Sequence, residues 1–166
     1  MKKKEKIFEE NYKQFKNQIF LFVLARVSSR EDALDITAET FLSAWENLES
    51  FRGDSNYKTW IFAICRHKIN DYFRKLYKYN DIFNEEIELD NIGDTQTNTD
   101  EDNELINSFT FENLMGKLKN IEKELILLKY MNNLNFAECA QVLNISESNA
   151  RVLHHRTLSK LRKFNN

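Results

Sequence analysis

The residues best suited to chemistry lie near the carboxyl end of the chain, between Phe136 and Leu161. Short polar side chains at the start of a helix can reach the edges of DNA bases, and cations further along can hold phosphates. The outward face of such a helix is expected to carry Glu147, Ser148, Asn149, Arg151, Val152, His155, Arg156 and Lys160. Base contacts are expected from Ser148, Asn149, Arg151 and His155. The alternative is a helical hairpin whose basic side is merely solvated.

A second segment, from Phe51 to Lys75, interleaves aromatic rings with cations. This combination suits single-stranded nucleic acid, because bases stack on rings and phosphates pair with cations. Within it, a loop of small polar residues can enclose the edge of an unstacked base. The rings are Phe51, Tyr57, Trp60, Phe62, Tyr72 and Phe73, the cations are Arg52, Lys58, Arg66, His67, Lys68, Arg74 and Lys75, and the loop is Gly53, Asp54, Ser55 and Asn56. The alternative is that most of the rings, Trp60 and Tyr72 among them, belong to a helical core.

Helices must position these residues, because apolar residues recur at intervals of three and four and no window alternates with period two. A first helix is expected along Phe8, Tyr12, Phe15, Ile19, Phe22 and Leu24. A second should begin after Ser29, with Asp32 in its first turn, and bury Leu34, Ala38, Phe41, Trp45 and Leu48. A third should run from about Tyr57 to Tyr77. With no proline and three glycines, the chain is predicted to be all-α.

The carboxyl-terminal candidates require two helices joined by a tight turn. Asn135 and Glu138 have the spacing of a capping box at the start of the first helix, and Ala140 permits close approach of the second. Asn144 tolerates the positive φ that the turn requires, and Ser146 can cap the second helix.

The remaining elements of this region follow from the same pattern. Ile145 is expected to fill the seam between the two helices, and the second of them to end near Phe164. Its predicted buried stripe consists of Ala150, Leu153, Leu158 and Leu161. Upstream, helical patterning resumes near Leu105, and Asn120 is expected to cap a further helix.

The charge of the chain is unevenly distributed, although its net value is only −2. Residues 1–80 carry 15 Lys and Arg against 11 Asp and Glu, a net charge of +4. Residues 81–108 contain 10 acidic residues and no Lys or Arg, and residues 109–166 have 9 Lys and Arg against 5 acids. Because a block of one charge with few apolar residues usually stays solvated, 81–108 is predicted to be a flexible acidic linker between two helical domains, 1–80 and 109–166.

The composition also excludes some classes of protein. The longest apolar run, from Ile19 to Ala25, is far shorter than the ~20 residues needed to span a bilayer, so a cytoplasmic protein is expected. Two cysteines, Cys65 and Cys139, exclude a disulfide-stapled scaffold and a four-thiolate zinc site. Each lies on an apolar stripe, which favours buried structural thiols over redox sensors.

Together these segments resemble the extracytoplasmic-function (ECF) subfamily of bacterial sigma-70 factors. Residues 31–45 (EDALDITAETFLSAW) resemble the segment that docks on the polymerase β′ clamp, and residues 51–61 (FRGDSNYKTWI) the loop that captures a flipped −10 base. Residues 64–75 (ICRHKINDYFRK) resemble the helix that contacts the edge of the −10 duplex, and the final helix-turn-helix is similar to the −35 reader.

This resemblance implies a function and partners. A region 2 domain and a region 4 domain would bind core RNA polymerase, at the β′ clamp and β flap, and direct it to promoters. The implied polymerase-binding residues are Asp35, Glu39, Thr40, Phe41 and Trp45. The implied −10 residues are Arg52, Gly53, Asp54, Ser55, Asn56, Tyr57, Lys58, Trp60, Arg66, His67 and Asn70. No catalytic residue, metal or cofactor is implied. The free protein would be a monomer, an anti-sigma factor is a further expected partner, and the linker would lie in the enzyme's nucleic-acid channel.

The sequence departs from the family pattern at five positions. Ala38 stands where Gln is usual, His67 where Asn is common, and Ile61 where primary sigma factors have a second Trp. In the last helix, Ala150 replaces Val and Leu153 replaces Arg, so no base contact is expected from Leu153.

Two other classes of function compete with this interpretation. A helix-turn-helix repressor or activator would bind a palindrome as a dimer, without polymerase. An enzyme would have to use groups such as His154, His155, Asp71 and the Glu31–Asp32 pair, but none of the spacings typical of metal, nucleotide or dinucleotide sites is present.

Overall fold

A computed structural model describes residues 2–27, 29–81 and 105–164. These residues form helices joined by short connections, and the described ranges contain no strand, so the predicted all-α class is confirmed. Most of the predicted linker, residues 82–104, lies outside the described residues. The described residues at the two ends of the predicted linker are helical. α3 ends at Asp81, the first residue of that linker, and α4 begins at Leu105, before the linker was predicted to end.

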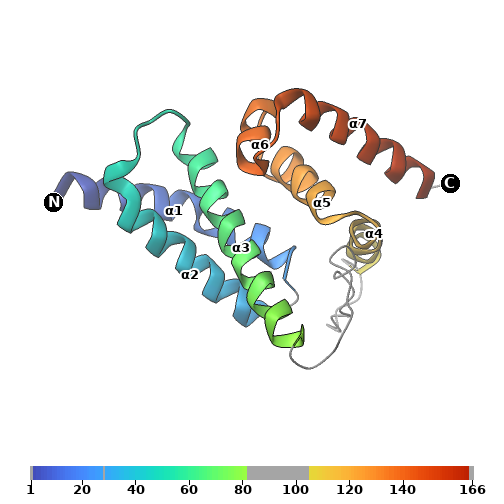
Figure 1. The fold of residues 1–166 in the computed structure, drawn as a ribbon, viewed down its shortest axis with the longest axis horizontal. Helices are drawn as coiled ribbons and strands as arrows, with labels where there is room; N and C mark the ends of the chain where they lie inside the picture. The colour runs from blue at the N-terminus through green and yellow to red at the C-terminus, as the bar shows by residue number, and fades with distance from the viewer. Residues whose placement is uncertain (1, 28, 82–104, 165–166) are drawn as a thin grey trace. The chain divides into compact units, whose positions relative to one another are not determined.

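The first domain consists of helices α1 (Lys2–Leu24), α2 (Arg30–Asn47) and α3 (Tyr57–Asp81), with a 3₁₀ turn at Leu48–Ser50. The three helices pack against one another, as Figure 1 shows. Ring contacts such as that between Phe22 and Phe62, whose centroids lie 5.3 Å apart, fill the core. The other fully buried apolar side chains of α1 and α3 are Ile19, Val23, Ile61, Cys65 and Ile69. The predicted stripe of the first helix is thus largely correct, although Tyr12 is exposed.

The predicted stripe on α2 is wrong at its amino-terminal half. The structure exposes Leu34 and Ala38. It buries instead Ala33, Ile36, Thr40, Phe41 and Ala44. Two alanines and a threonine suit this inward face, because small side chains let helices approach closely. The hydroxyl of Thr40 donates to the Ile36 carbonyl (2.8 Å), which satisfies this polar group without a partner from another helix.

The starts of α2 and α3 are fixed by side-chain caps. Ser29 Oγ accepts a hydrogen bond from the Asp32 backbone N–H (3.2 Å), as predicted, and Asn56 Oδ1 accepts one from the Thr59 N–H (2.8 Å). The Tyr72 hydroxyl of α3 donates to Asp32 Oδ2 (2.9 Å) and so joins α3 to the first turn of α2. Burial, reinforced by this carboxylate, raises the pKa of Tyr72 to about 12, so its hydroxyl remains a donor at physiological pH.

The second domain contains α4 (Leu105–Gly116), α5 (Asn120–Ile126), α6 (Phe136–Leu143) and α7 (Glu147–Phe164). A π-helical turn over Leu127–Met131 extends α5. Asn120 is the first residue of α5, so the prediction that it caps this helix is wrong. Lys119 occupies the cap position, and the Glu122 carboxylate accepts its backbone N–H (2.7 Å).

The turn between α6 and α7 forms as the sequence predicts. Asn135 and Glu138 exchange two hydrogen bonds of 2.8 and 2.9 Å, which complete the capping box. Asn144 has a φ of 55°, and Ser146 Oγ accepts from the Asn149 N–H (3.1 Å) at the start of α7. The Ser146 cap fixes the first turn of α7, where the candidate base-contacting residues begin.

The inner face of α7 differs in part from the prediction. Ala150 is fully buried, whereas Leu153, Leu158 and Leu161 are only half-buried. The second fully buried residue is Thr157, whose hydroxyl donates to the Leu153 carbonyl (2.8 Å). A threonine can occupy this interior position because its own helix satisfies its hydroxyl.

Replacing Asn144 tests the turn directly. We expect Asn144→Ala to destabilise the α6–α7 unit by about 1 kcal/mol. A left-handed φ crowds Cβ against a carbonyl oxygen, and alanine lacks the short polar side chain whose local hydrogen bonding offsets this cost in asparagine. Asn144→Gly should cost almost nothing, since glycine adopts this conformation freely. Amide hydrogen exchange in α6 and α7 measures the difference, with Gln141→Ala, at an exposed position of α6, as control. Equal effects of the alanine and glycine variants would contradict the role of the turn.

Both cysteines are buried, as predicted. Cys65 is fully enclosed in the first domain and Cys139 in the second. Burial raises the pKa of Cys139 to about 11, which keeps this thiol protonated at physiological pH. Cys139 therefore behaves as a small core residue.

Candidate nucleic-acid interface

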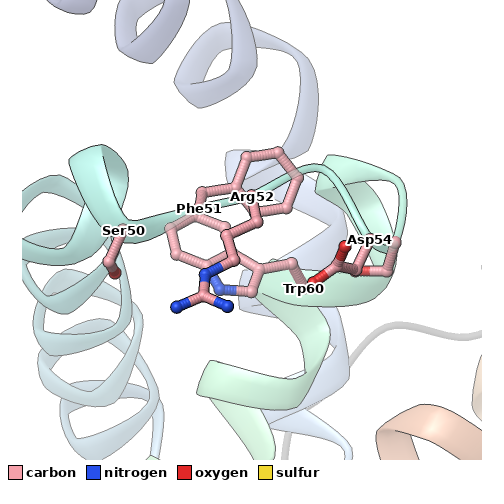
Figure 2. Close-up of a pocket in the computed structure, with 6 residues that line it drawn as sticks. Ser50, Phe51, Arg52, Asp54 and Trp60 are labelled. Carbon is pink, nitrogen blue, oxygen red and sulfur yellow. The ribbon is translucent and has the colours of Figure 1, made fainter.

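The loop after α2 and the start of α3 form a pocket of about 320 Å³. Gly53, with a φ of 77°, lets the chain turn back toward α3. Phe51 and Trp60 form the aromatic wall, their ring centroids 4.8 Å apart. Figure 2 shows these rings with Arg52 beside them and Asp54 across the pocket. The full lining consists of Ser50, Phe51, Arg52, Asp54, Ser55 and Trp60. Aromatic, cationic and acceptor groups around one hollow can receive an unstacked base.

Tyr57 supports this pocket and does not line it. Its ring lies 5.3 Å from Trp60 on one side and 6.1 Å, nearly parallel, from Phe15 of α1 on the other. Burial raises the pKa of the Tyr57 hydroxyl to about 12. The two rings predicted to stack on bases therefore differ in position. Tyr57 faces the core, whereas Trp60 is half-exposed and lines the pocket.

The other candidates of this segment are partly accessible. Arg52, Gly53, Asp54, Asn56 and His67 are exposed. Ser55, Lys58, Arg66 and Asn70 are half-buried. Asn70 lies four residues after Arg66 and three after His67, so it neighbours both on the surface of α3. Asn56 has a structural task as well, because its side chain caps α3.

On α7, most of the predicted outward residues are exposed. These are Glu147, Ser148, Asn149, Arg151, Val152, His155 and Arg156. Lys160 differs: its ammonium pairs with Glu122 Oε2 of α5 (3.0 Å), and the residue is half-buried. The two partners are 38 positions apart in sequence, so the helical pattern gave no sign of this ion pair. In the free protein Lys160 is engaged in holding α7 to α5.

Arg151 is oriented by two neighbours. Its guanidinium Nη2 donates to Glu147 Oε1 (2.6 Å), and its Cζ lies 4.6 Å from the ring centroid of Phe136, the first residue of α6. Lys129 Nζ lies 4.3 Å from the same ring. The Phe136 ring thus contacts two cations. The sequence analysis missed this role. A single aromatic residue after a capping residue is only a weak indication of a cation-binding ring.

His154 lies beside this platform and belongs to the domain's internal structure. Its Nε2 is 2.7 Å from the Tyr130 hydroxyl, and its ring meets that of Phe136 edge-on at 5.1 Å. Burial, together with the positive charges of Lys129 and His155, lowers the pKa of His154. A neutral His154 can therefore hold Tyr130 against α7 at physiological pH.

The predicted polymerase-binding set splits between core and surface. Thr40 and Phe41 are buried, so their side chains are not available to a partner. Trp45 is half-buried, with Phe8 at 5.2 Å edge-on and Lys4 Nζ 4.8 Å from its ring. Asp35 and Glu39 are exposed. Beside them lies an apolar line of Leu34, Ala38 and Leu42, one helical turn apart. The sequence analysis assigned Leu34 and Ala38 to the core.

Comparison with known proteins decides the family. The model of Sigma-70 region 2 matches residues 12–79, and that of Sigma-70 region 4 matches residues 108–161. RNA polymerase sigma factor YlaC of Bacillus subtilis is 30% identical over 167 residues, covering 98% of this chain and 94% of that protein. The chain belongs to the sigma-70 family. This sigma factor is also 27% identical over 160 residues to the ECF RNA polymerase sigma factor SigM of Bacillus subtilis, with 95% and 94% of the two chains covered.

The fold agrees with this assignment to the sigma-70 family. The sigma factor RpoE of Bartonella quintana, solved in complex with the anti-sigma factor NepR, aligns with a TM-score of 0.74 at 21% identity over 95% of this chain and 96% of that one. A sigma factor directs RNA polymerase to promoters, so the polymerase-independent repressor or activator is not favoured. The family is one of transcription initiation factors and not of classical enzymes.

The described ranges contain neither a membrane-spanning helix nor a cluster of metal-binding side chains. None of the helices placed there is long and apolar enough to cross a bilayer. Among the same residues, no three His, Cys, Asp or Glu side chains gather where they could hold a metal ion.

Proposed function

We propose that this sigma factor reads the −35 element with α7 and the −10 element with the pocket before α3. The observation that carries the proposal is the pairing of an exposed, capped recognition helix in one domain with an aromatic–cationic pocket in the other. The residues involved are Arg52, Gly53, Asp54, Ser55, Asn56, Lys58, Trp60, Arg66, His67 and Asn70 for −10, and Ser148, Asn149, Arg151, Val152, His155 and Arg156 for −35. Tyr57 and Lys160 support these two surfaces from behind.

We further propose that α2 docks on the β′ clamp of core polymerase and that the second domain contacts the β flap. The exposed face of α2 combines a line of apolar side chains, Leu34, Ala38 and Leu42, with the carboxylates of Asp35 and Glu39. We define these five residues as the α2 docking face. An apolar centre bordered by charge is the usual composition of a protein interface. Trp45, packed against Phe8, borders this face at the carboxyl end of α2.

Charge explains why the two DNA-reading surfaces require the polymerase. Residues 1–80 and 109–166 each carry a net charge of only +4, and residues 81–108 carry −10. Each domain alone would bind DNA weakly, and the acidic segment would repel it. On core enzyme, in the cytoplasm, the two domains are held together, so that one weak reader reinforces the other. The free protein would be a monomer, and an anti-sigma factor is a further proposed partner.

Run-off transcription with core polymerase, with and without this protein, tests the function. We expect promoter-specific transcripts only when both are present, and no retention of promoter DNA by the sigma factor alone. Tight binding of a palindrome by a dimer of this protein, without polymerase, would overturn the proposal in favour of a conventional helix-turn-helix regulator.

Removing the aromatic wall tests the −10 pocket. Trp60→Ala should lower the affinity of holoenzyme for a single-stranded −10 oligonucleotide roughly 10- to 100-fold, because one base–aromatic stack contributes about 1–3 kcal/mol. Fluorescence anisotropy of a labelled oligonucleotide measures this loss. Tyr77→Ala, which removes a half-buried ring further along the same helix, is the control and should bind normally. Equal binding by the two variants would place base capture elsewhere.

A further inference from the structure

The outward direction of α7 is fixed by its two fully buried residues. Ala150 and Thr157 are two turns apart and therefore mark one line along the inner side of the helix. Val152 follows Ala150 by two residues, which turns it by about 200° at 3.6 residues per turn. The side chain of Val152 thus lies almost diametrically opposite the buried line, and 48% of the residue is exposed.

The neighbours of Val152 make it the centre of the reading face. Ser148 lies one turn before it and His155 one turn after it, and both are exposed. Arg151, by contrast, projects to the side, where Glu147 and Phe136 hold its guanidinium. Among the described residues of α7, the other exposed large apolar side chain is Phe164, at the far end of the helix.

The chemistry of base edges assigns a ligand to this position. In the major groove the thymine C5-methyl is the apolar group on a base edge, while the other positions are hydrogen-bond donors and acceptors. A β-branched valine presents two methyl groups with little rotational freedom, so it can pack on such a group at small entropic cost. Isolated apolar residues are common on protein surfaces, but Val152 stands at the middle of a face whose other members are polar.

We infer that Val152 packs against the C5-methyl of one thymine in the −35 element and makes this promoter position specific for a T·A pair. The inference rests on the proposed function, since it requires α7 to lie in the major groove. Ser148 and His155 would contact the adjacent bases or phosphates on either side of this thymine.

The test removes only the methyl group. A −35 element is first selected from a random pool with holoenzyme containing the full chain, and each of its thymines is then replaced singly by uracil. We expect one replacement to weaken holoenzyme binding about fourfold, which corresponds to the burial of one methyl-sized group. Val152→Ala should abolish the sensitivity at that position, and the alanine variant should fold normally because alanine is the better helix former. Val152→Ile should retain it.

If uracil is tolerated at every position while Arg151→Ala still weakens −35 binding, the role of Val152 is wrong but the proposed function stands. If selection yields no −35 preference at all, the proposed function itself fails. A 5-methylcytosine·guanine pair at the sensitive position asks whether the methyl alone suffices. A pair with 5-methylcytosine should bind more tightly than the same pair with cytosine, because the two bases differ only in the C5-methyl group. Equal binding of the two would contradict the methyl contact.

Discussion

Replacing Arg151 and His155 together with alanine should abolish −35-dependent transcription and leave binding to core polymerase unchanged. Both side chains project from the first half of α7, away from the buried Ala150 and Thr157. Loss of a good contact to a base costs about 1–3 kcal/mol, so losing two should reduce initiation roughly a hundredfold or more. Run-off transcription and a core-binding assay on the same preparations measure the two effects.

A control that removes at least as much positive charge separates base reading from general attraction to DNA. Arg162 and Lys163 are exposed at the carboxyl end of the same helix. Replacing both with alanine also removes positive charge, but from the end remote from the capped start of α7. We expect a small, salt-dependent loss in this variant. If the Arg151/His155 variant instead lost core binding, the assignment of α7 to DNA would be wrong.

Truncating two leucines of the α2 docking face should have the opposite effect. Leu34→Ala with Leu42→Ala should weaken core binding by about 3 kcal/mol, roughly a hundredfold, because two leucines that become buried in the complex are shortened. Their exposure in the free protein, 51% and 58%, means that helicity should be unchanged. Competition with a labelled sigma factor for core polymerase measures the loss.

An exposed leucine elsewhere in the same domain provides the matched control. Leu21 of α1 is 49% exposed, so Leu21→Ala removes a comparable apolar surface outside α2 and should leave core binding intact. Phe41→Ala is a contrasting variant: because this ring is buried beside Tyr12 (4.8 Å), its loss should destabilise the domain by about 3–5 kcal/mol. Equal core binding by the Leu34/Leu42 and Leu21 variants would remove α2 as the docking helix.

The sequence predicted best what depends on residues close together in the chain. The Ser29 and Ser146 caps, the Asn135–Glu138 box and the positive φ of Asn144 each involve at most four consecutive positions, and all form. Local hydrogen bonds of this kind have few competitors, so residue type and spacing determine them.

Features that depend on distant residues were predicted less well. Large side chains were taken to mark the inner face of α2, but Ala33 and Ala44 occupy it because α1 and α3 approach closely, and Leu34 is left outside. Lys160 was interpreted as a phosphate-binding cation, and its partner Glu122 lies on another helix. The direction in which Arg151 points likewise depends on Phe136. The periodicity of one helix does not indicate which side chains of another helix will contact it.

The caps also bear on how quickly the protein becomes usable after its gene is expressed. Those of α2, α3, α6 and α7 each join residues three positions apart, so every one of these helices can begin forming without help from distant chain. Helical domains rich in local contacts fold in microseconds to milliseconds, whereas ribosomes add about 5–20 residues each second. The three-helix domain should therefore be folded while the second domain is still being translated. The speed of a transcriptional response through this sigma factor is then set by its synthesis and its access to polymerase, with folding adding no delay.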